Sequence, residues 1–454
     1  MIHKYKMNDL NIVLDVNSGS IHCVDDISYD ILDYYKKENI ESIINILKEK
    51  YSDSDIREAY EELKELEENE VLFSPDVFSN IIPEVDNRKP VVKALCLHIA
   101  HDCNLKCKYC FAEEGEYHGK RSLMSVEVGK KAIDFLIENS GSRRNLEIDF
   151  FGGEPLMNFD VVKEIVEYGR SVEKQHNKNF RFTMTTNGIL LNDEISDYIN
   201  KNMHNAVLSL DGRKEINDKM RVRAGGQGSY DNIVPKFVKM AEDRNQMDYY
   251  VRGTFTRNNL DFAKDVLHLA DLGFKQISIE PVVTDEKEDY AIREEDLPVI
   301  FEEYEKLAKE MLNRREKGEW FNFFHFMIDL TGGPCAHKRL VGCGSGTEYL
   351  AVTPEGDLFP CHQFVGQDEF KMGTVFDGVL RKDIRQDFEG INVYSKPACK
   401  SCWAKFYCSG GCAASSNNMH NDLITPYEIG CELQKKRTEC SIMMKVYEAV
   451  NEEV

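Results

Sequence analysis

The residues best suited to chemistry in this sequence are cysteines, concentrated in the stretch CNLKCKYC at 103–110. Cys103, Cys107 and Cys110 fall within eight residues of a chain that shows no export signal. In a reducing compartment such spacing indicates metal binding rather than disulfides. The three residues therefore predict a metal site.

Zinc is the first metal to consider, and it usually takes four protein ligands. The other histidine and cysteine side chains nearby are Cys96, His98 and His101, two of which fall inside the strand expected before the cysteines. Three thiols without an evident fourth ligand are unusual for zinc.

A second group of cysteines lies in the last third of the chain. Its densest part is CKSCWAKFYCSGGC at 399–412, which by itself is compatible with a zinc ribbon. The members of the group are Cys343, Cys361, Cys399, Cys402, Cys408, Cys412 and Cys431. Cys335 stands eight residues before the first of them. The cysteines outside both groups are Cys23, Cys96 and Cys440, and we interpret the first two as small apolar residues.

Charge and length limit the class of protein. A formal net charge of -22 argues against binding to nucleic acid, which needs a basic surface. A chain of 454 residues is expected to form two or three domains. Its first residues lack the apolar core of a signal peptide, and no apolar run approaches the roughly 20 residues that span a bilayer. We therefore expect a cytoplasmic protein with neither a membrane nor a nucleic acid partner.

Strands alternate with helices between residues 91 and 282, which predicts a parallel α/β arrangement. The expected strands are VKALCLHIA, NLEIDFFGG, FRFTMTTNG, HNAVLSLDG, DYYVRGTFT and FKQISIEPV. A closed barrel needs eight strands, so six predict an open, partial (β/α)6 barrel. The cysteines at 103–110 follow the first strand and should lie at the carboxyl ends of the strands, where barrel enzymes keep their chemistry.

The regions on either side of this barrel differ from it. Residues 1–80 contain a hairpin (NIVLDV and SIHCVD), three helical stretches and a short closing strand in EVLFSPD, which together predict a winged-helix-like domain. The strongly acidic stretch 52–70 argues against DNA binding by this domain. Pro83 and DNRKP indicate a linker, 283–330 a bridging region with helical and aromatic parts, and 331–454 a separate cysteine-rich domain.

The spacing C-x3-C-x2-C after a strand resembles the signature of radical S-adenosylmethionine (SAM) enzymes. In that family three thiolates hold three irons of a 4Fe-4S cluster and SAM binds the fourth. The resemblance implies a set of SAM-binding residues, namely Tyr109, Gly152, Gly153, Glu154, Pro155, Thr186, Asn187, Ser209, Arg221 and Val282. Glycines in the GGEP stretch would let the backbone approach the ligand, and the arginine fork suits a carboxylate.

Beside such a core, the second group of cysteines resembles the SPASM extension of radical SAM enzymes that modify peptides. The resemblance implies an outer 4Fe-4S cluster held by Cys399, Cys402, Cys408 and Cys431. An inner cluster would take Cys343, Cys361 and Cys412, and its fourth iron is open unless Cys335 completes it. We favour the open iron. The implied cofactors are SAM and three clusters, one that binds SAM and two auxiliary ones.

Over nearly its whole length the chain is similar to the radical SAM/SPASM maturases of sactipeptides, in particular those of the cysteine-rich SCIFF peptides. The similarity implies an oxidoreductase, a sactisynthase, that works anaerobically and joins a peptide cysteine to the α-carbon of an acceptor residue. A radical derived from SAM would remove the α-hydrogen, and a substrate thiolate on the open inner iron would couple to that carbon. Implied partners are the cysteine-rich precursor peptide and an electron donor such as flavodoxin or ferredoxin. The leader of the peptide would add a strand to the N-terminal sheet near residues 21–24.

Other functions stay open. Sulfatase-maturing relatives make formylglycine and carry an aspartate base directly after the cysteine that matches Cys361, where this chain has His362. Carbon–carbon or carbon–oxygen cross-linking of a peptide shares all the motifs. An iron–sulfur electron carrier or a zinc-binding adaptor would leave GGEP, Ser209 and Arg221 without a purpose. For the N-terminal region, a purely structural cap on the barrel is the alternative to peptide recognition.

Overall fold

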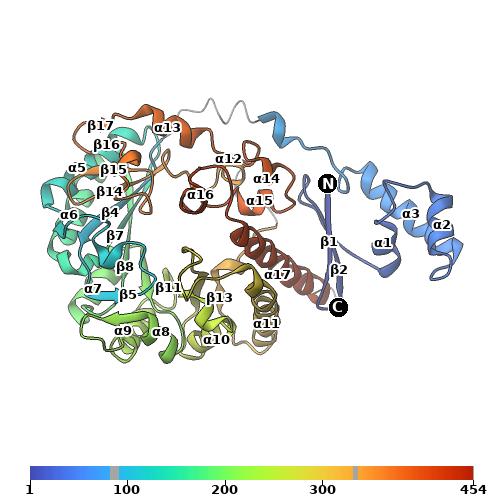
Figure 1. The fold of residues 1–454 in the computed structure, drawn as a ribbon, viewed down its shortest axis with the longest axis horizontal. Coiled ribbons are helices and arrows are strands. Elements are labelled where there is room, and N and C mark those ends of the chain that lie inside the picture. The colour runs from blue at the N-terminus through green and yellow to red at the C-terminus, as the bar shows by residue number, and fades with distance from the viewer. Residues whose placement is uncertain (82–90, 331–335, 453–454) are drawn as a thin grey trace.

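A computed structural model describes residues 1–81, 91–330 and 336–452. Its centre is a sheet in which six parallel strands follow one another in chain order (Figure 1). They are β4 (Ala94–His101), β7 (Asn145–Gly152), β8 (Asn179–Thr186), β9 (Asn205–Ser209), β11 (Tyr249–Phe255) and β12 (Gln276–Pro281). These are the six strands that the sequence predicts, and the expected α/β class is confirmed. Among the described residues the sheet stays open and forms no closed barrel.

Burial along the strands explains why they form this sheet. All residues of β4 are buried, as expected for a largely apolar strand covered on both faces. β7 and β8 instead alternate buried and more exposed residues, the period of a strand with unequal faces. The helices that connect the strands are α5 (Val126–Asn139), α6 (Phe159–His176), α7 (Asp193–Asn202), α8 (Lys214–Met220), α9 (Tyr230–Asp243) and α10 (Ala263–Asp271).

The sheet continues beyond the six predicted strands at both edges. β13 (Asn322–Phe323) pairs with β12, and β14 (Tyr349–Val352) pairs in parallel with β4. Three antiparallel strands follow, β15 (Asp357–Phe359), β16 (Gly373–Thr374) and β17 (Gly378–Val379), while β6 (Ser122–Leu123) also pairs with β4. The C-terminal part of the chain therefore extends the same sheet that carries the first cysteine loop.

The N-terminal region begins with three antiparallel strands, β1 (Ile2–Met7), β2 (Leu10–Asp15) and β3 (Ile21–Val24). The expected hairpin is β2–β3, but the closing strand predicted in EVLFSPD is wrong, because that stretch contains no strand. β1 is the third strand instead. It joins β2 through Asn8 and Asp9, whose φ angles of 52° and 60° suit the tight turn of a two-residue hairpin. The strands thus precede the helices, unlike the order expected of a winged helix.

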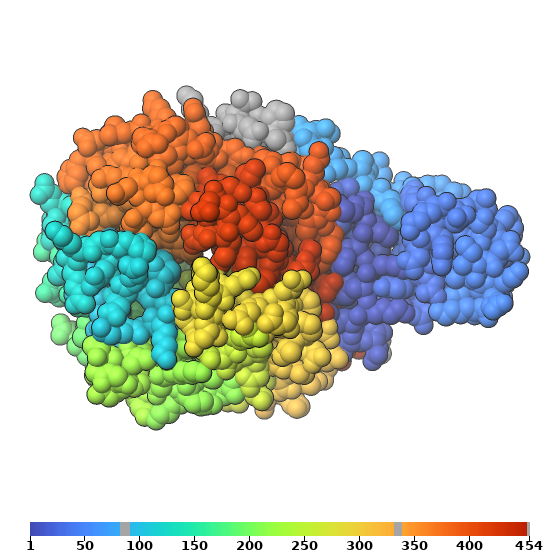
Figure 2. Space-filling view, in the orientation of Figure 1, coloured from blue at the N-terminus to red at the C-terminus, as the bar shows by residue number. Residues whose placement is uncertain are grey.

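Three helices follow these strands, α1 (Asp26–Ile31), α2 (Ile40–Leu47) and α3 (Asp53–Glu68), as predicted. They enclose a small core of their own with Val13 of β2, and Figure 2 shows them as a lobe that projects from the main body. The residues of the other sheet face belong to the main core, among them Tyr5, Ile12 and Leu14. The N-terminal sheet is therefore shared between the lobe and the main body.

The remaining helices lie in the second half of the chain. They are α11 (Leu297–Glu316), α12 (Ala336–Val341), α13 (Lys382–Glu389), α14 (Pro397–Lys400), α15 (Lys405–Cys408), α16 (Ala413–His420) and α17 (Glu428–Glu452). α17 packs against α11 and lies beside β1 and β2 (Figure 1). The short paired strands β5 (Leu105–Cys107) and β10 (Arg221–Arg223) form a separate two-stranded sheet.

Some sequence-based expectations fall outside the described residues, namely Cys335, Pro83 and the DNRKP linker. Within the described residues, no helix has the length and apolar character needed to cross a bilayer.

Candidate functional site

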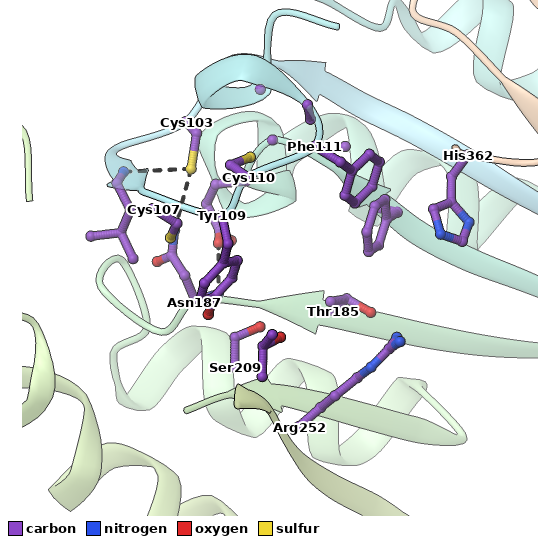
Figure 3. A pocket seen from close by; sticks show the side chains of 18 of the residues that line it. Cys103, Cys107, Tyr109, Cys110, Phe111, Thr185, Asn187, Ser209, Arg252 and His362 are labelled. Atoms are coloured by element: carbon purple, nitrogen blue, oxygen red, sulfur yellow. Dashed lines mark hydrogen bonds between the residues drawn. The ribbon is translucent and has the colours of Figure 1, made fainter. Parts of the chain in front are cut away.

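A cavity of about 290 Å³ opens at the carboxyl ends of the parallel strands (Figure 3). Cys103, Cys107 and Cys110 line it. So does every residue assigned to SAM by resemblance: Tyr109, Gly152, Gly153, Glu154, Pro155, Thr186, Asn187, Ser209, Arg221 and Val282. The structure brings all of these side chains and turns to one place, although their role as ligands stays a prediction.

The cysteine loop is held by backbone pairing and by polar contacts to sulfur. β5 pairs with β10, which places Cys107 directly opposite Arg221. The backbone N–H of Leu105 donates to Cys103 Sγ at 3.4 Å, and Asn187 Nδ2 donates to the same sulfur at 3.6 Å (Figure 3). Burial raises the pKa of Cys103 and Cys107 to about 12, so both are thiols without a metal. Metal coordination would be needed to keep them as thiolates here.

Gly152 and Gly153 allow the backbone of the GGEP stretch to press against the start of the cysteine loop. A Cβ on Gly153 would lie 2.1 Å from the carbonyl oxygen of Asp102, and one on Gly152 would lie 2.4 Å from that of Ala100. Gly152 also has a φ of +123°, which disfavours other residues. The sequence predicts a close approach to the ligand, whereas the contacts within the chain are to the backbone of residues 100–102.

Glu154 ties the GGEP stretch to the end of β8. Its buried carboxylate accepts hydrogen bonds from Thr186 Oγ1 at 2.8 Å, the backbone N–H of Asn187 at 2.8 Å and the backbone N–H of Leu156 at 3.0 Å. Burial raises the pKa of Glu154 to about 7 despite these donors. The side chain thus joins two turns that line the cavity, 154–156 and 186–187.

Asp211 supports this site from behind the cavity lining, and the sequence analysis did not single it out. Its side chain is fully buried and accepts hydrogen bonds from Tyr109 Oη at 2.6 Å, Arg221 Nε at 3.0 Å and the backbone N–H of Thr254 at 2.9 Å. The Arg221 guanidinium also lies 5.5 Å from the Tyr109 ring centroid. One carboxylate therefore positions two of the predicted SAM-binding residues. The sequence signal that could have pointed to Asp211 is its position two residues after Ser209, at the end of a predicted strand.

Further polar side chains line the cavity, among them Arg252, Glu280 and His362. Arg252 Nη2 donates to Glu280 Oε2 at 2.9 Å. His362 comes from the C-terminal part of the chain (Figure 3). Its Nδ1 lies 3.3 Å from the Tyr349 hydroxyl. Burial, followed by the charge of Arg252, lowers the pKa of His362 to about 4, so the imidazole is neutral at physiological pH.

The four cysteines predicted to hold the outer cluster line a second cavity, of about 420 Å³. They are Cys399, Cys402, Cys408 and Cys431. Helices α14, α15 and α17 supply three of them, and Cys402 lies between the first two helices. Burial comes first among the causes that raise the pKa of Cys431 to about 12, followed by the charges of the other three thiols. The structure thus gathers residues that are up to 32 positions apart in the chain.

The three cysteines predicted for the inner cluster are also neighbours. Burial raises the pKa of Cys361 to about 12, and the nearby sulfurs of Cys412 and Cys343 raise it further. Cys361 directly precedes His362, so this group lies beside the first cavity.

The donor sets are cysteine thiols, the ligand type that iron–sulfur clusters take. Within the described ranges, no three histidine, cysteine, aspartate or glutamate side chains are grouped as the ligands of one metal ion would be. A cluster imposes a different arrangement, because its cysteines bind separate iron atoms. The three thiols of the loop also share their cavity with polar groups suited to a charged ligand.

The central part of the chain, residues 97–243, matches the family model described as the Radical SAM superfamily. Among curated relatives, the cysteine-type anaerobic sulfatase-maturating enzyme of Clostridium novyi (strain NT) is 24% identical over 371 residues, which are 77% of this chain and 94% of that one. The antilisterial bacteriocin subtilosin biosynthesis protein AlbA of Bacillus subtilis (strain 168) is 26% identical over 293 residues, 64% of this chain and 59% of that one.

Solved structures share the fold. Native anSMEcpe with bound AdoMet and the Cp18Cys peptide has a TM-score of 0.65 at 20% identity, covering 80% of this chain and 99% of that chain. Streptococcus suis SuiB bound to the precursor peptide SuiA has a TM-score of 0.54 at 16% identity, covering 94% of this chain and 98% of that chain. The chain therefore has the α/β radical SAM fold.

Proposed function

We propose that the protein is a radical SAM maturase that forms intramolecular thioether bonds in a ribosomally made, cysteine-rich peptide. The observation that carries the proposal is that the inner group of cysteines adjoins the cavity lined by the cysteine loop. Cys361, assigned to the inner cluster, is followed by His362, which lines the same cavity as the cysteine loop. A substrate thiol at the inner group would thus lie close to a peptide carbon placed in that cavity.

The residues around the cavity have separable roles in this proposal. Cys103, Cys107 and Cys110 would hold a 4Fe-4S cluster, and bound SAM supplies the radical that abstracts hydrogen. Arg221, fixed by Asp211, presents a charged fork to the carboxylate of the bound molecule. Glu154 holds the turns at 154–156 and 186–187 together through the hydrogen bonds of its carboxylate.

The inner group of cysteines would serve the substrate. Cys343, Cys361 and Cys412 would provide three thiolates, and unless Cys335 completes the cluster its fourth iron would be open for a cysteine of the peptide. Coordination there would deprotonate the thiol and so provide the anionic sulfur for bond formation. The overall change is the loss of two hydrogens from the peptide for each carbon–sulfur bond formed: one would leave as a hydrogen atom to the SAM-derived radical, the other as the thiol proton, and the remaining electron would pass to the inner cluster.

Peptide recognition is proposed at the N-terminal sheet. β3 is an edge strand of the order β1–β2–β3, and an edge offers unpaired backbone groups to an extended leader. The similarity in fold to SuiB, which was solved with a precursor peptide, supports a peptide partner. A cytoplasmic location and a flavodoxin or ferredoxin as electron donor belong to the same proposal.

Formylglycine formation is the main alternative, because relatives named as sulfatase-maturating enzymes align with most of the chain. His362 argues against it, since those enzymes place an aspartate at the matching position. Cross-linking through carbon or oxygen is a further alternative that the same site accommodates.

Mass spectrometry of a cysteine-rich peptide encoded beside the gene separates these functions. The peptide is incubated anaerobically with the full chain, SAM and a reductant. A thioether gives a loss of two hydrogens per bond, with fragmentation blocked between a cysteine and its acceptor. Exchange of a cysteine sulfur for oxygen would support formylglycine instead. Unmodified cysteines in a peptide that has lost two hydrogens would indicate a carbon or oxygen cross-link.

A further inference from the structure

Lys396 is a buried lysine between the two cysteine groups of the C-terminal region. It caps the start of α14 and is 1% exposed. Its Nζ donates to the carbonyl oxygen of Gly410 at 2.8 Å. An ammonium has three N–H donors, and in the described part of the chain Lys396 forms no ion pair with a carboxylate.

A second buried lysine nearby shows how such a charge is normally compensated. Lys405 is 2% exposed, and its Nζ lies 2.9 Å from Asp76 Oδ2. The same Nζ lies 4.9 Å from the ring centroids of both Tyr394 and Phe406. Burial of a charge is costly without such partners. The contrast leaves Lys396 in need of a counter-charge.

The groups around Lys396 that favour its charged form are thiols. They are Cys399, Cys408, Cys412 and Cys431. Three of these belong to the proposed outer set and Cys412 to the inner set. The position of Lys396 agrees, because its carbonyl accepts from the backbone N–H of Cys399 at 3.0 Å and its Nζ binds the carbonyl of Gly410, which lies between Cys408 and Cys412 in the chain. Burial lowers the pKa of Lys396, while negative sulfur at these positions raises it. Coordination deprotonates a thiol outright, so a bound cluster would supply the negative charge that the protein lacks here.

We propose that Lys396 is the shared counter-charge of the two auxiliary iron–sulfur sites and sets their reduction potentials. The inference rests on the proposed function for the presence of these clusters. Reduction adds one negative charge to a cluster, and a fixed ammonium in a poorly solvated interior stabilises that charge. Net charge and hydrogen bonding are among the factors that fix cluster potentials. Lys396 lines neither of the two cavities, so it would act on the clusters through its charge alone.

The test is a redox titration of the full, anaerobically reconstituted chain, followed by electron paramagnetic resonance. In Lys396→Met we expect the reduced auxiliary clusters to be disfavoured about tenfold, a shift of about 59 mV to lower potential for one electron. Lys396→Arg keeps the charge and should stay near the wild-type potential. Lys400→Met is the matched control, because Lys400 lies next to Cys399 but is exposed, so that solvent screens its charge.

Iron content distinguishes the possible results. Loss of auxiliary iron in Lys396→Met but not in Lys396→Arg would also support a role for the charge. An unchanged potential in Lys396→Met with full iron content would overturn the inference, as would equal iron loss in both variants. Wild-type protein without auxiliary clusters would instead refute the proposed function itself, and the inference with it.

Discussion

At the scale of single residues, the site depends on a few buried charges, each held by several hydrogen-bond donors. Asp211 is the clearest case, because it joins Tyr109 of the cysteine loop to Arg221 of β10. The Arg221 side chain is 11% exposed and Asp211 is 0% exposed, so solvent contributes little to their stabilisation. Removing one partner of such a pair leaves the other charge buried without compensation.

Replacing Asp211 should therefore destabilise the fold as well as the site. Asp211→Asn is expected to lower the free energy of unfolding by about 3 kcal/mol, measured by denaturant titration. Asp231→Asn is the control, since Asp231 forms an exposed pair with Lys214 and should change stability by less than about 1 kcal/mol. Equal effects of the two substitutions would show that the buried pair does not support the site.

His362 gives a prediction for pH. Its pKa in the folded chain is about 4, below the ordinary value of 6.5, so folding favours the neutral ring. The stability that depends on this ring is present above pH 6.5 and is lost as the pH falls towards 4. Between pH 7.5 and pH 5, wild type should lose about 2 kcal/mol more than His362→Gln. Parallel stability curves for the two proteins, measured by denaturant unfolding, would contradict the burial of the ring.

At the scale of elements, the site is made by turns that approach each other too closely for side chains. The end of β7 contacts the start of the cysteine loop through Gly152 and Gly153. Both contacts are made by backbone atoms, so a larger residue at either position would push the loop out of place. The same turns carry Glu154, which fixes the end of β8.

Gly153→Ala should displace the cysteine loop without disturbing the C-terminal sites. We expect loss of the iron held by the loop and of SAM cleavage, while auxiliary iron remains, because the added Cβ would overlap the Asp102 carbonyl. Gly390→Ala is the control, since its Cβ would meet its nearest neighbour at an ordinary distance of 3.7 Å. Iron analysis and a deoxyadenosine assay measure both effects. Full loop iron in Gly153→Ala would contradict the close packing.

The N-terminal sheet offers a comparison between its two edges. If the leader pairs with β3, hydrogen exchange of the amides in Ile21–Val24 should slow when the leader peptide is added, because new backbone hydrogen bonds protect them. β1 is the opposite edge and should keep its exchange rate. Protection confined to β1, or no protection at either edge, would argue against strand addition at β3.

Sequence patterns predicted the elements that depend on local signals. Alternation and apolar runs located the six central strands, and cysteine spacing grouped the thiols that the structure brings together. β1 was missed because its lysines and histidine hide the strand pattern, and EVLFSPD was misread because a short apolar run does not show whether a partner strand exists. The pairing of β14 with β4 and the role of Asp211 depend on contacts between distant segments. Local patterns carry no information on such contacts.

At the scale of the whole molecule, the N-terminal sheet, the C-terminal region and the central sheet are joined. The His3 and Trp403 rings stack at 3.7 Å, so β1 touches the segment that carries the outer cysteines. β14 continues the sheet from β4, so the C-terminal region also borders the cysteine loop. The sheet that carries the proposed leader site is therefore in direct contact with the C-terminal region, which in turn continues the sheet of the cysteine loop.

The central claim is that Cys103, Cys107 and Cys110 hold a 4Fe-4S cluster with one iron free to bind SAM. Electron paramagnetic resonance of the reduced, reconstituted chain tests it most directly, recorded with and without SAM. We predict that SAM alters one cluster signal, and that this signal is missing when the three cysteines are replaced by alanine while the auxiliary signals persist. A spectrum that SAM does not change, or a wild-type protein that contains only zinc, would contradict the account.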